Sequence, residues 1–191
     1  MVKVLVPLFT GFEEIEAITI IDILRRAEVD VVTAGLSPNP VMGAHGIPVV
    51  ADIDIEAAEA DAYAGIVLPG GAGTATLRSD PRVRTLVTDF YQQGKTTAAV
   101  CAAPTVLSEL GLLKDKKATS YPSVRSSMIV GTYLEDSVVV DDLIITSRGA
   151  GTAMAFALEL AAHFSSPEQA QAVAHAVMAD YPIADRDGVI G

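Results

Sequence analysis

Short apolar runs that alternate with helical patterns constrain the fold of this chain more than any other feature. Strand-like Lys3–Leu8 is followed by amphipathic Glu14–Ala27 and then by strand-like Val29–Ala34. The alternation continues with strands at Ile66–Leu68, Thr97–Val100 and Leu143–Thr146 and helices at Val83–Gln93, Pro104–Leu110 and Thr152–Phe164. Strands that alternate with helices form βαβ units. The order therefore predicts an α/β fold with a doubly wound, mostly parallel sheet sandwiched by helices.

The remaining segments fit the edges and the end of such a sheet. Asn39–Gly46 and Asp136–Val140 are typical of hairpin excursions at a sheet edge. Ser166, Pro167 and Gln169 supply an N-cap, a first-turn proline and a capping-box residue, which predicts a last helix to about Met178. The tail 181–191 has no periodicity. With 191 residues the chain is expected to form one domain, 1–191.

Composition excludes several classes of function. The 13 basic and 24 acidic residues give a net charge of −11, which disfavours nucleic acid and anionic membranes as partners. No apolar run is long enough for a signal peptide or a membrane span, so a soluble cytoplasmic protein is expected. A single cysteine excludes an internal disulfide. The three scattered histidines lack the spacing of metal ligands, and neither a metal nor a cofactor is expected.

Cys101, the single cysteine, lies where an apolar strand passes into a helix that small residues open. Backbone N–H groups and the helix dipole at such a position favour the thiolate, so we expect a lowered thiol pKa. The alternative is a buried cysteine that acts as a small apolar residue. The neighbouring motifs favour a nucleophile.

Four loops leave the carboxyl ends of predicted strands, where sites form in doubly wound sheets. They are Leu8–Glu13, Pro69–Gly73, Cys101–Ala103 and Ser147–Gly151. Gly70 and Gly71 form a tight turn in the plain interpretation. Combined with the N–H of Ala102, the N–H of Gly71 would complete a two-donor oxyanion hole.

Three glutamates open the first predicted helix. Glu13 has capping-box spacing from Thr10, and Glu14 suits the helix dipole, so neither is given a catalytic role. Glu16 heads the apolar stripe of Ile20, Ile23 and Ala27. Burial there would raise its pKa and keep the carboxyl protonated for hydrogen bonding or proton transfer, whereas a solvated glutamate is the alternative.

Arg148, in the segment Arg148–Thr152, is placed either to bind an anion or to pair with a structural carboxylate. The two helical histidines, His163 and His175, are interpreted as structural or surface residues.

Taken together, four segments resemble the ThiJ/PfpI superfamily, in the branch of the human parkinsonism-associated protein deglycase and bacterial YajL. They are Gly11–Ala17, Leu68–Gly71, Ala99–Thr105 and Thr146–Thr152. The resemblance implies a flavodoxin-like sandwich, a homodimer, and a reactive Cys101 beside a protonated Glu16. The apolar positions of the first helix, Ile15, Ile18, Ile21 and Leu24, also favour a homodimer.

The resemblance implies a glutathione-independent glyoxalase or protein deglycase that acts on small dicarbonyls such as methylglyoxal or on glycated protein. Cys101 would be the nucleophile, Glu16 the proton shuttle, and Gly71 and Ala102 the oxyanion donors. The alternative is a non-enzymatic oxidative-stress sensor or chaperone with an oxidisable Cys101.

Three departures from the family pattern concern Ala102, Tyr121 and His45. Ala102 stands where peptidases of the family place histidine, which disfavours a peptidase. Tyr121 replaces the deglycase histidine, and His45 replaces an arginine. With Gly70 and Arg148, these two residues are the expected substrate-binding residues.

Overall fold

A computed structural model describes residues 1–180. Its central sheet has seven strands in the order β10-β11-β7-β6-β1-β2-β5. They are β1 (Lys3–Leu8), β2 (Asp30–Gly35), β5 (Ile53–Asp54), β6 (Gly65–Leu68), β7 (Thr96–Val100), β10 (Val138–Asp141) and β11 (Ile144–Ser147). Every neighbouring pair is parallel except β10 and β11. This order confirms the predicted mostly parallel sheet with an antiparallel excursion at its edge.

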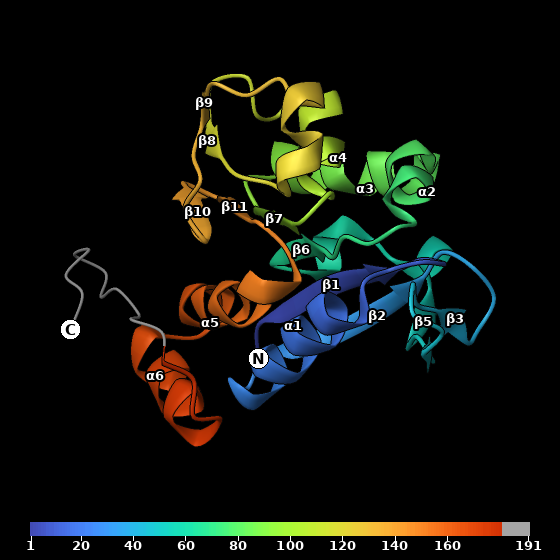
Figure 1. The fold of residues 1–191 in the computed structure, drawn as a ribbon. Helices are drawn as coiled ribbons and strands as arrows, with labels where there is room; N and C mark the ends of the chain where they lie inside the picture. Colours follow the sequence, from blue (N-terminus) through green and yellow to red (C-terminus); the bar gives the residue numbers. More distant parts are fainter. Residues whose placement is uncertain (181–191) are drawn as a thin grey trace.

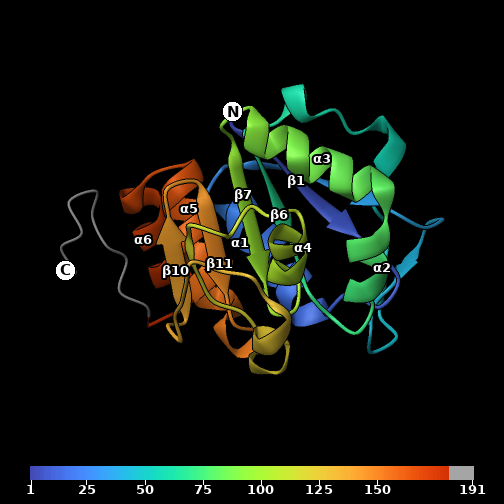
Figure 2. The ribbon, with the colours of Figure 1, turned by 90° about the horizontal axis from the view of Figure 1, so that it is seen from above.

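Helices cover both faces of the sheet (Figures 1 and 2). One face carries α1 (Glu14–Arg26), α5 (Ala153–Phe164) and α6 (Pro167–Ala176), and the other carries α2 (Thr74–Ser79), α3 (Pro81–Gln92) and α4 (Pro104–Glu109). Because both faces are covered, the central strands β6 and β7 are fully buried. No helix within residues 1–180 is long and apolar enough to cross a membrane.

Short elements connect these layers. They are the antiparallel pair β3 (Val41–Met42) and β4 (Pro48–Val49), the parallel pair β8 (Lys117–Ala118) and β9 (Thr132–Tyr133), and the 3-10 turns η1 (Ile55–Ala57), η2 (Ala60–Ala62), η3 (Pro122–Ser127) and η4 (Ala150–Thr152). The β3–β4 pair confirms the predicted hairpin. The sequence pattern did not predict α2, because its six residues are too few to show helical periodicity.

The capping predictions had different outcomes at the two ends of the chain. At α6, the Ser166 hydroxyl accepts the Gln169 N–H at 3.1 Å, as predicted, although the helix ends at Ala176. At α1, the Thr10–Glu13 capping box is wrong. Glu13 is the N-cap residue but its side chain makes no capping bond, and the Thr10 hydroxyl pairs with Ser37 instead.

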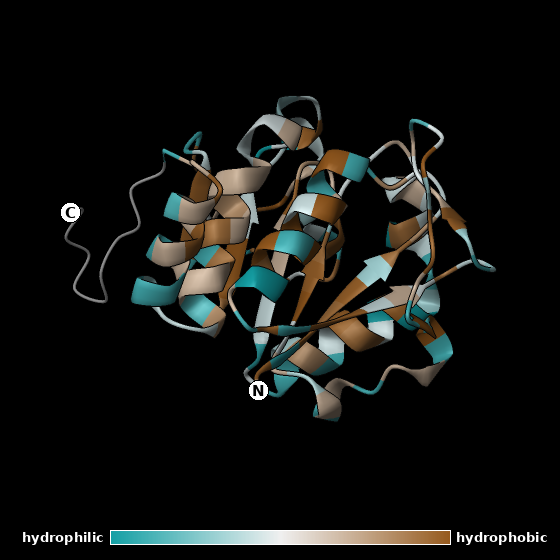
Figure 3. Ribbon diagram, turned by 90° about the horizontal axis from the view of Figure 1, so that it is seen from below, coloured by the Kyte–Doolittle hydropathy of each residue, from teal (hydrophilic) through white to brown (hydrophobic). Residues whose placement is uncertain are grey.

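The outer surface of α1 is less apolar than expected. In Figure 3, hydrophobic and hydrophilic residues alternate along the ribbon of α1. Ile21 is 8% exposed and Leu24 is fully buried, so both belong to the core and the expectation that they add spare apolar surface is wrong. Ile15 and Ile18 are 58% and 42% exposed, so these two side chains are accessible for contact with a second copy of the chain. The predicted tail, 181–191, lies outside the described residues, and the single-domain expectation, which includes it, stays a prediction.

Candidate active site

The four predicted loops meet at the carboxyl edge of the sheet. The N–H of Gly73 donates to the Gly11 carbonyl at 2.9 Å, and the N–H of Glu13 donates to the Gly70 carbonyl at 2.8 Å. The N–H of Cys101 donates to the Ser147 carbonyl at 3.0 Å. The convergence follows from parallel pairing, which brings the carboxyl ends of β1, β6, β7 and β11 to one edge.

Cys101 occupies a strained turn directly after β7. Its φ of +64° lies in the left-handed region, which costs a non-glycine residue free energy. Three other non-glycine residues within 1–180 share this conformation, but all three lie in exposed positions, whereas Cys101 is partly buried. The turn is held on both sides, because the Cys101 carbonyl also accepts the Tyr121 N–H at 2.7 Å. A strained, well-anchored residue between a strand and a helix is typical of a nucleophile elbow.

Glu16 lies on the first turn of α1 with no solvent exposure. One carboxyl oxygen, Oε2, accepts the Gly70 N–H at 2.7 Å, and Oε1 has no hydrogen-bond partner among residues 1–180. Burial raises the pKa of Glu16 to about 7. The interactions of the carboxyl with the Cys101 thiol and the Gly70 N–H act in the opposite direction, and the charge of Glu13 adds to the rise. The pKa therefore moves in the direction that the sequence predicts, and the carboxyl exchanges a proton near neutral pH.

Gly70 and Gly71 suit this site because a side chain at either position would collide with neighbouring atoms. A Cβ on Gly70 would lie 2.7 Å from the Cys101 Cβ and 2.9 Å from Glu16 Oε2. Gly71 has a φ of +123°, and a Cβ there would lie 2.4 Å from the Glu13 nitrogen. The N–H groups of Gly71 and Ala102 both interact with the Cys101 thiol and lower its pKa. The two predicted oxyanion donors thus converge on the sulfur.

The predicted lowering of the Cys101 pKa is wrong. Burial raises the pKa of the thiol to about 12, and the charge of the Glu16 carboxylate adds to the rise, which outweighs the donors Ala102 and Gly71. The helix that follows is also short, since α4 begins three residues later and has six residues. Glu16, with its pKa near 7, therefore ionises before the thiol and lies beside it as a proton acceptor.

Of the expected substrate-binding residues, Tyr121 lies beside the sulfur. It is about half exposed, and its backbone N–H binds Cys101. A Cβ on Gly149 would lie 3.4 Å from the Tyr121 ring and 3.9 Å from Cys101 Sγ, so the ring forms a wall of the site. Arg148 precedes that glycine, but its guanidinium Nη1 donates to the Glu135 carbonyl at 2.7 Å, which ties down the segment between β9 and β10.

His45 pairs with the glutamates at the start of α1. Its Nδ1 lies 2.8 Å from Glu14 Oε2 and 3.6 Å from Glu13 Oε2, and its backbone N–H donates to Glu14 Oε1 at 2.6 Å. The bond to Glu14, with the charges of Glu13 and Glu14, raises the pKa of His45. Sequence reasoning missed this pairing, because it joins residues 31 positions apart. Potential metal ligands of the three residues lie within 4.8 Å of one another, but Glu14 already accepts the His45 bonds.

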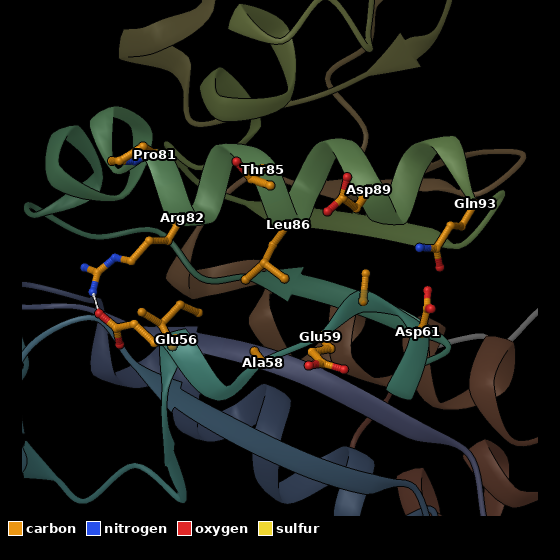
Figure 4. A pocket seen from close by; sticks show the side chains of 12 residues that line it. Glu56, Ala58, Glu59, Asp61, Pro81, Arg82, Thr85, Leu86, Asp89 and Gln93 are labelled. Carbon is orange, nitrogen blue, oxygen red and sulfur yellow. Dashed lines mark hydrogen bonds and ion pairs between the residues drawn. The ribbon is translucent and has the colours of Figure 1, made fainter.

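A separate cavity of about 700 Å³ lies between α3 and the η1–η2 segment (Figure 4). Leu86 and Ala58 line it together with acidic side chains, including Glu59 and Asp61. None of the residues around Cys101 lines this cavity. The reactive groups, the Cys101 thiol and the Glu16 carboxyl, lie together at the carboxyl edge of the sheet, so this cluster is the candidate active site.

Comparisons with known proteins agree with this geometry. Residues 2–163 match the DJ-1/PfpI family. The chain is 39% identical over 170 residues to protein DJ-1 homolog B of Arabidopsis thaliana, covering 87% of the chain and 39% of that longer protein. It is 36% identical over 159 residues to the glutathione-independent glyoxalase DJR-1.2 of Caenorhabditis elegans, covering 82% of the chain and 85% of that protein.

A deglycase of Pyrococcus abyssi is 28% identical over 159 residues, with 82% of the chain and 96% of that protein covered. Oxidised DJ-1 of Toxoplasma gondii has the same fold, with a TM-score of 0.90 at 38% identity over 95% of the chain and 100% of that structure. These likenesses support the flavodoxin-like architecture and the family resemblance seen in the motifs. The chain belongs to the DJ-1/PfpI family.

Proposed function

We propose that this protein is a cysteine-dependent, glutathione-independent glyoxalase that converts dicarbonyls of the methylglyoxal type into 2-hydroxy acids, and that it also acts on their early adducts with protein. One observation carries the proposal. A fully buried carboxyl, Glu16, with one unpartnered oxygen lies beside a strained cysteine on which two backbone donors converge. A relative named as a glutathione-independent glyoxalase and another named as a deglycase support the reaction class.

In the first step, the Cys101 sulfur attacks the aldehyde carbon and a carbon–sulfur bond forms. The thiol proton passes to the Glu16 carboxylate as the carbon–sulfur bond forms, because a thiol with a raised pKa needs a base in order to attack. The N–H groups of Gly71 and Ala102 stabilise the negative oxygen as it forms. Glu16 then returns the proton to that oxygen, which gives a hemithioacetal and leaves Glu16 ionised again.

In the second step, Glu16 removes the proton from the former aldehyde carbon and delivers it to the neighbouring carbon, by way of an enediol. The hydroxyl proton moves to the second oxygen, and the product is a thioester of Cys101. Water hydrolyses the thioester, releasing the 2-hydroxy acid and the free thiol. A carboxyl with a pKa of about 7 is suited to taking and giving the same proton near neutral pH. No electrons enter or leave, so no cofactor is required.

The proposal is tested by conversion of methylglyoxal to lactate without glutathione. We expect Cys101→Ser to abolish turnover and Glu16→Gln to reduce it on the order of 10²-fold or more, because glutamine cannot exchange a proton. Circular dichroism should show that both variants are folded. Near-wild-type turnover by Glu16→Gln would remove this mechanism.

The alternative function is an oxidative-stress sensor or chaperone that uses the same residues. The unpartnered Oε1 of Glu16, when protonated, would donate a hydrogen bond to a cysteine sulfinate. In that case Glu16→Gln should leave any turnover intact and change sulfinate formation by peroxide, seen as a mass gain of about two oxygens.

We also propose a homodimer. Ile18 of α1 lines a groove with Val49 and Val50, and Ile15, about one turn earlier on the same helix, is also exposed. Light scattering should give twice the 19.9 kDa chain mass. Ile18→Glu should reduce it to one chain, whereas Ile129→Glu, at an exposed isoleucine outside this surface, should not. A wild-type particle of one chain's mass at micromolar concentration would exclude the dimer.

A further inference from the structure

The carboxylate of Glu13 does not cap α1, and within residues 1–180 its one ionic partner is the imidazole of His45. Capping-box spacing predicts that it secures the start of α1, but it makes no capping bond. Its side chain is only 15% exposed and forms no hydrogen bond within residues 1–180. Its ionic partner, His45 Nδ1, lies 3.6 Å from Oε2 on a side chain that is itself 68% exposed. A largely buried carboxylate without a hydrogen bond carries a desolvation cost, which invites a functional explanation.

The backbone of Glu13 is fixed against the active-site glycines. Its N–H donates to the Gly70 carbonyl at 2.8 Å, and a Cβ on Gly71 would lie 2.4 Å from its nitrogen. Gly71 supplies one of the two N–H groups that face the thiol. The field of Glu13 also reaches the active site, since its charge contributes to the raised pKa of Glu16.

The charges around Glu13 leave this side of the site negative. Glu13 and Glu14 share one imidazole, so the three side chains carry a net charge of −1 even when His45 is protonated. Arg148, next to Gly149, and Arg125, four residues after Tyr121, are both held at Glu135. Arg148 donates to the Glu135 carbonyl, and Arg125 forms an ion pair with the Glu135 carboxylate at 2.8 Å.

We propose that Glu13 is a specificity-determining residue that repels anionic substrates from Cys101, so that the enzyme acts on neutral and cationic α-oxoaldehydes and discriminates against those that carry a carboxylate. The inference rests on the proposed function for its substrate class. The electrostatic selection itself acts on any molecule that approaches the sulfur, so it is measurable without turnover.

The first test compares alkylation of Cys101 by iodoacetamide and iodoacetate, which are similar in size and differ in charge. The ratio of their rates, divided by the same ratio for free cysteine, removes the intrinsic reactivity of each reagent. Differences in the thiol pKa between variants also cancel in this ratio. The comparison is made at pH 6, where Glu16, with a pKa of about 7, is mostly protonated and adds little repulsion. We expect wild type to favour iodoacetamide at least about tenfold over the free-cysteine ratio, which corresponds to about 1.4 kcal/mol of repulsion between unit charges.

Three variants assign the effect to the charge of Glu13. Glu13→Gln should reduce the preference about fivefold or more, and Glu13→Asp should retain most of it. Glu59→Gln should leave it unchanged, because Glu59 is an exposed carboxylate at the separate cavity in Figure 4. A wild-type ratio equal to that of free cysteine, or a ratio unchanged in Glu13→Gln, would overturn the inference.

The second test uses turnover of 4,5-dioxopentanamide and 4,5-dioxopentanoate, a neutral and an anionic α-oxoaldehyde of matched shape. We expect wild type to have a higher kcat/KM for the amide, and Glu13→Gln to narrow the difference. Absence of turnover with both compounds would contradict the proposed function, whereas the alkylation ratio would still decide the role of Glu13. Equal kcat/KM for the two compounds would contradict the selection alone.

Discussion

The buried carboxyl of Glu16 should make folding stability depend on pH in a defined way. Its pKa is about 7 in the folded protein, against 4.5 for an unperturbed glutamate. Because the folded state holds the proton more tightly, the free energy of unfolding falls as pH rises from about 4.5 to about 7 and is then constant. The difference in pKa corresponds to about 3 kcal/mol in total, of which about 2.5 kcal/mol is lost between pH 5 and pH 8.

Glu16→Gln isolates this contribution. Glutamine has nearly the same shape, cannot ionise, and can still accept the Gly70 N–H that Glu16 binds at 2.7 Å. All other titrating groups are shared with wild type. Burial, the largest cause of the raised Cys101 pKa, is the same in the variant, so the thiol stays protonated throughout the window. We therefore expect the variant to gain about 2.5 kcal/mol relative to wild type on going from pH 5 to pH 8.

The measurement is urea unfolding followed by far-ultraviolet circular dichroism, since the chain has no tryptophan. Protein concentration is held constant so that any association contributes equally. Glu59→Gln, which removes an exposed carboxylate, serves as the control and should show a pH dependence close to that of wild type. A constant stability difference between wild type and Glu16→Gln from pH 5 to pH 8 would refute a buried, proton-binding Glu16.

Two further outcomes follow from the site geometry. Because the charge of Glu16 contributes to the raised thiol pKa, the pH midpoint of iodoacetamide alkylation should lie lower in Glu16→Gln than in wild type, and an unchanged or higher midpoint would contradict that coupling. Gly71→Ala should lower the free energy of unfolding more than Gly94→Ala, although both glycines have positive φ, because a Cβ at position 71 meets backbone at 2.4 Å and one at position 94 meets nothing within 4 Å. Chemical unfolding should show a loss of about 1 kcal/mol for Gly94→Ala and a much larger loss for Gly71→Ala. Equal losses would refute the steric argument.

The sequence alone predicted the parallel architecture and the four loops that gather at the candidate site. Periodicity is a local property of the chain, so alternating strand and helix patterns predicted the parallel sheet that Figure 1 shows. Parallel strands necessarily bring their carboxyl ends together, which is why the segments containing Cys101, Glu16 and Gly71 could be expected to meet. The apolar stripe below Glu16 likewise predicted a buried carboxyl.

The tertiary structure decided how these groups behave. The pKa of Cys101 depends on the balance between burial, the Glu16 charge and two N–H donors. The local sequence predicts the donors, but it predicts neither the burial of the thiol nor the nearby charge of Glu16. The pairing of His45 with Glu14 joins a hairpin to a helix 31 positions away, so no local pattern predicts it. Glu13 has capping-box spacing, but its conformation leaves the carboxylate without a capping bond. Spacing along the chain determines which residues gather, whereas the distances and burial that set their charges arise only when distant segments pack together.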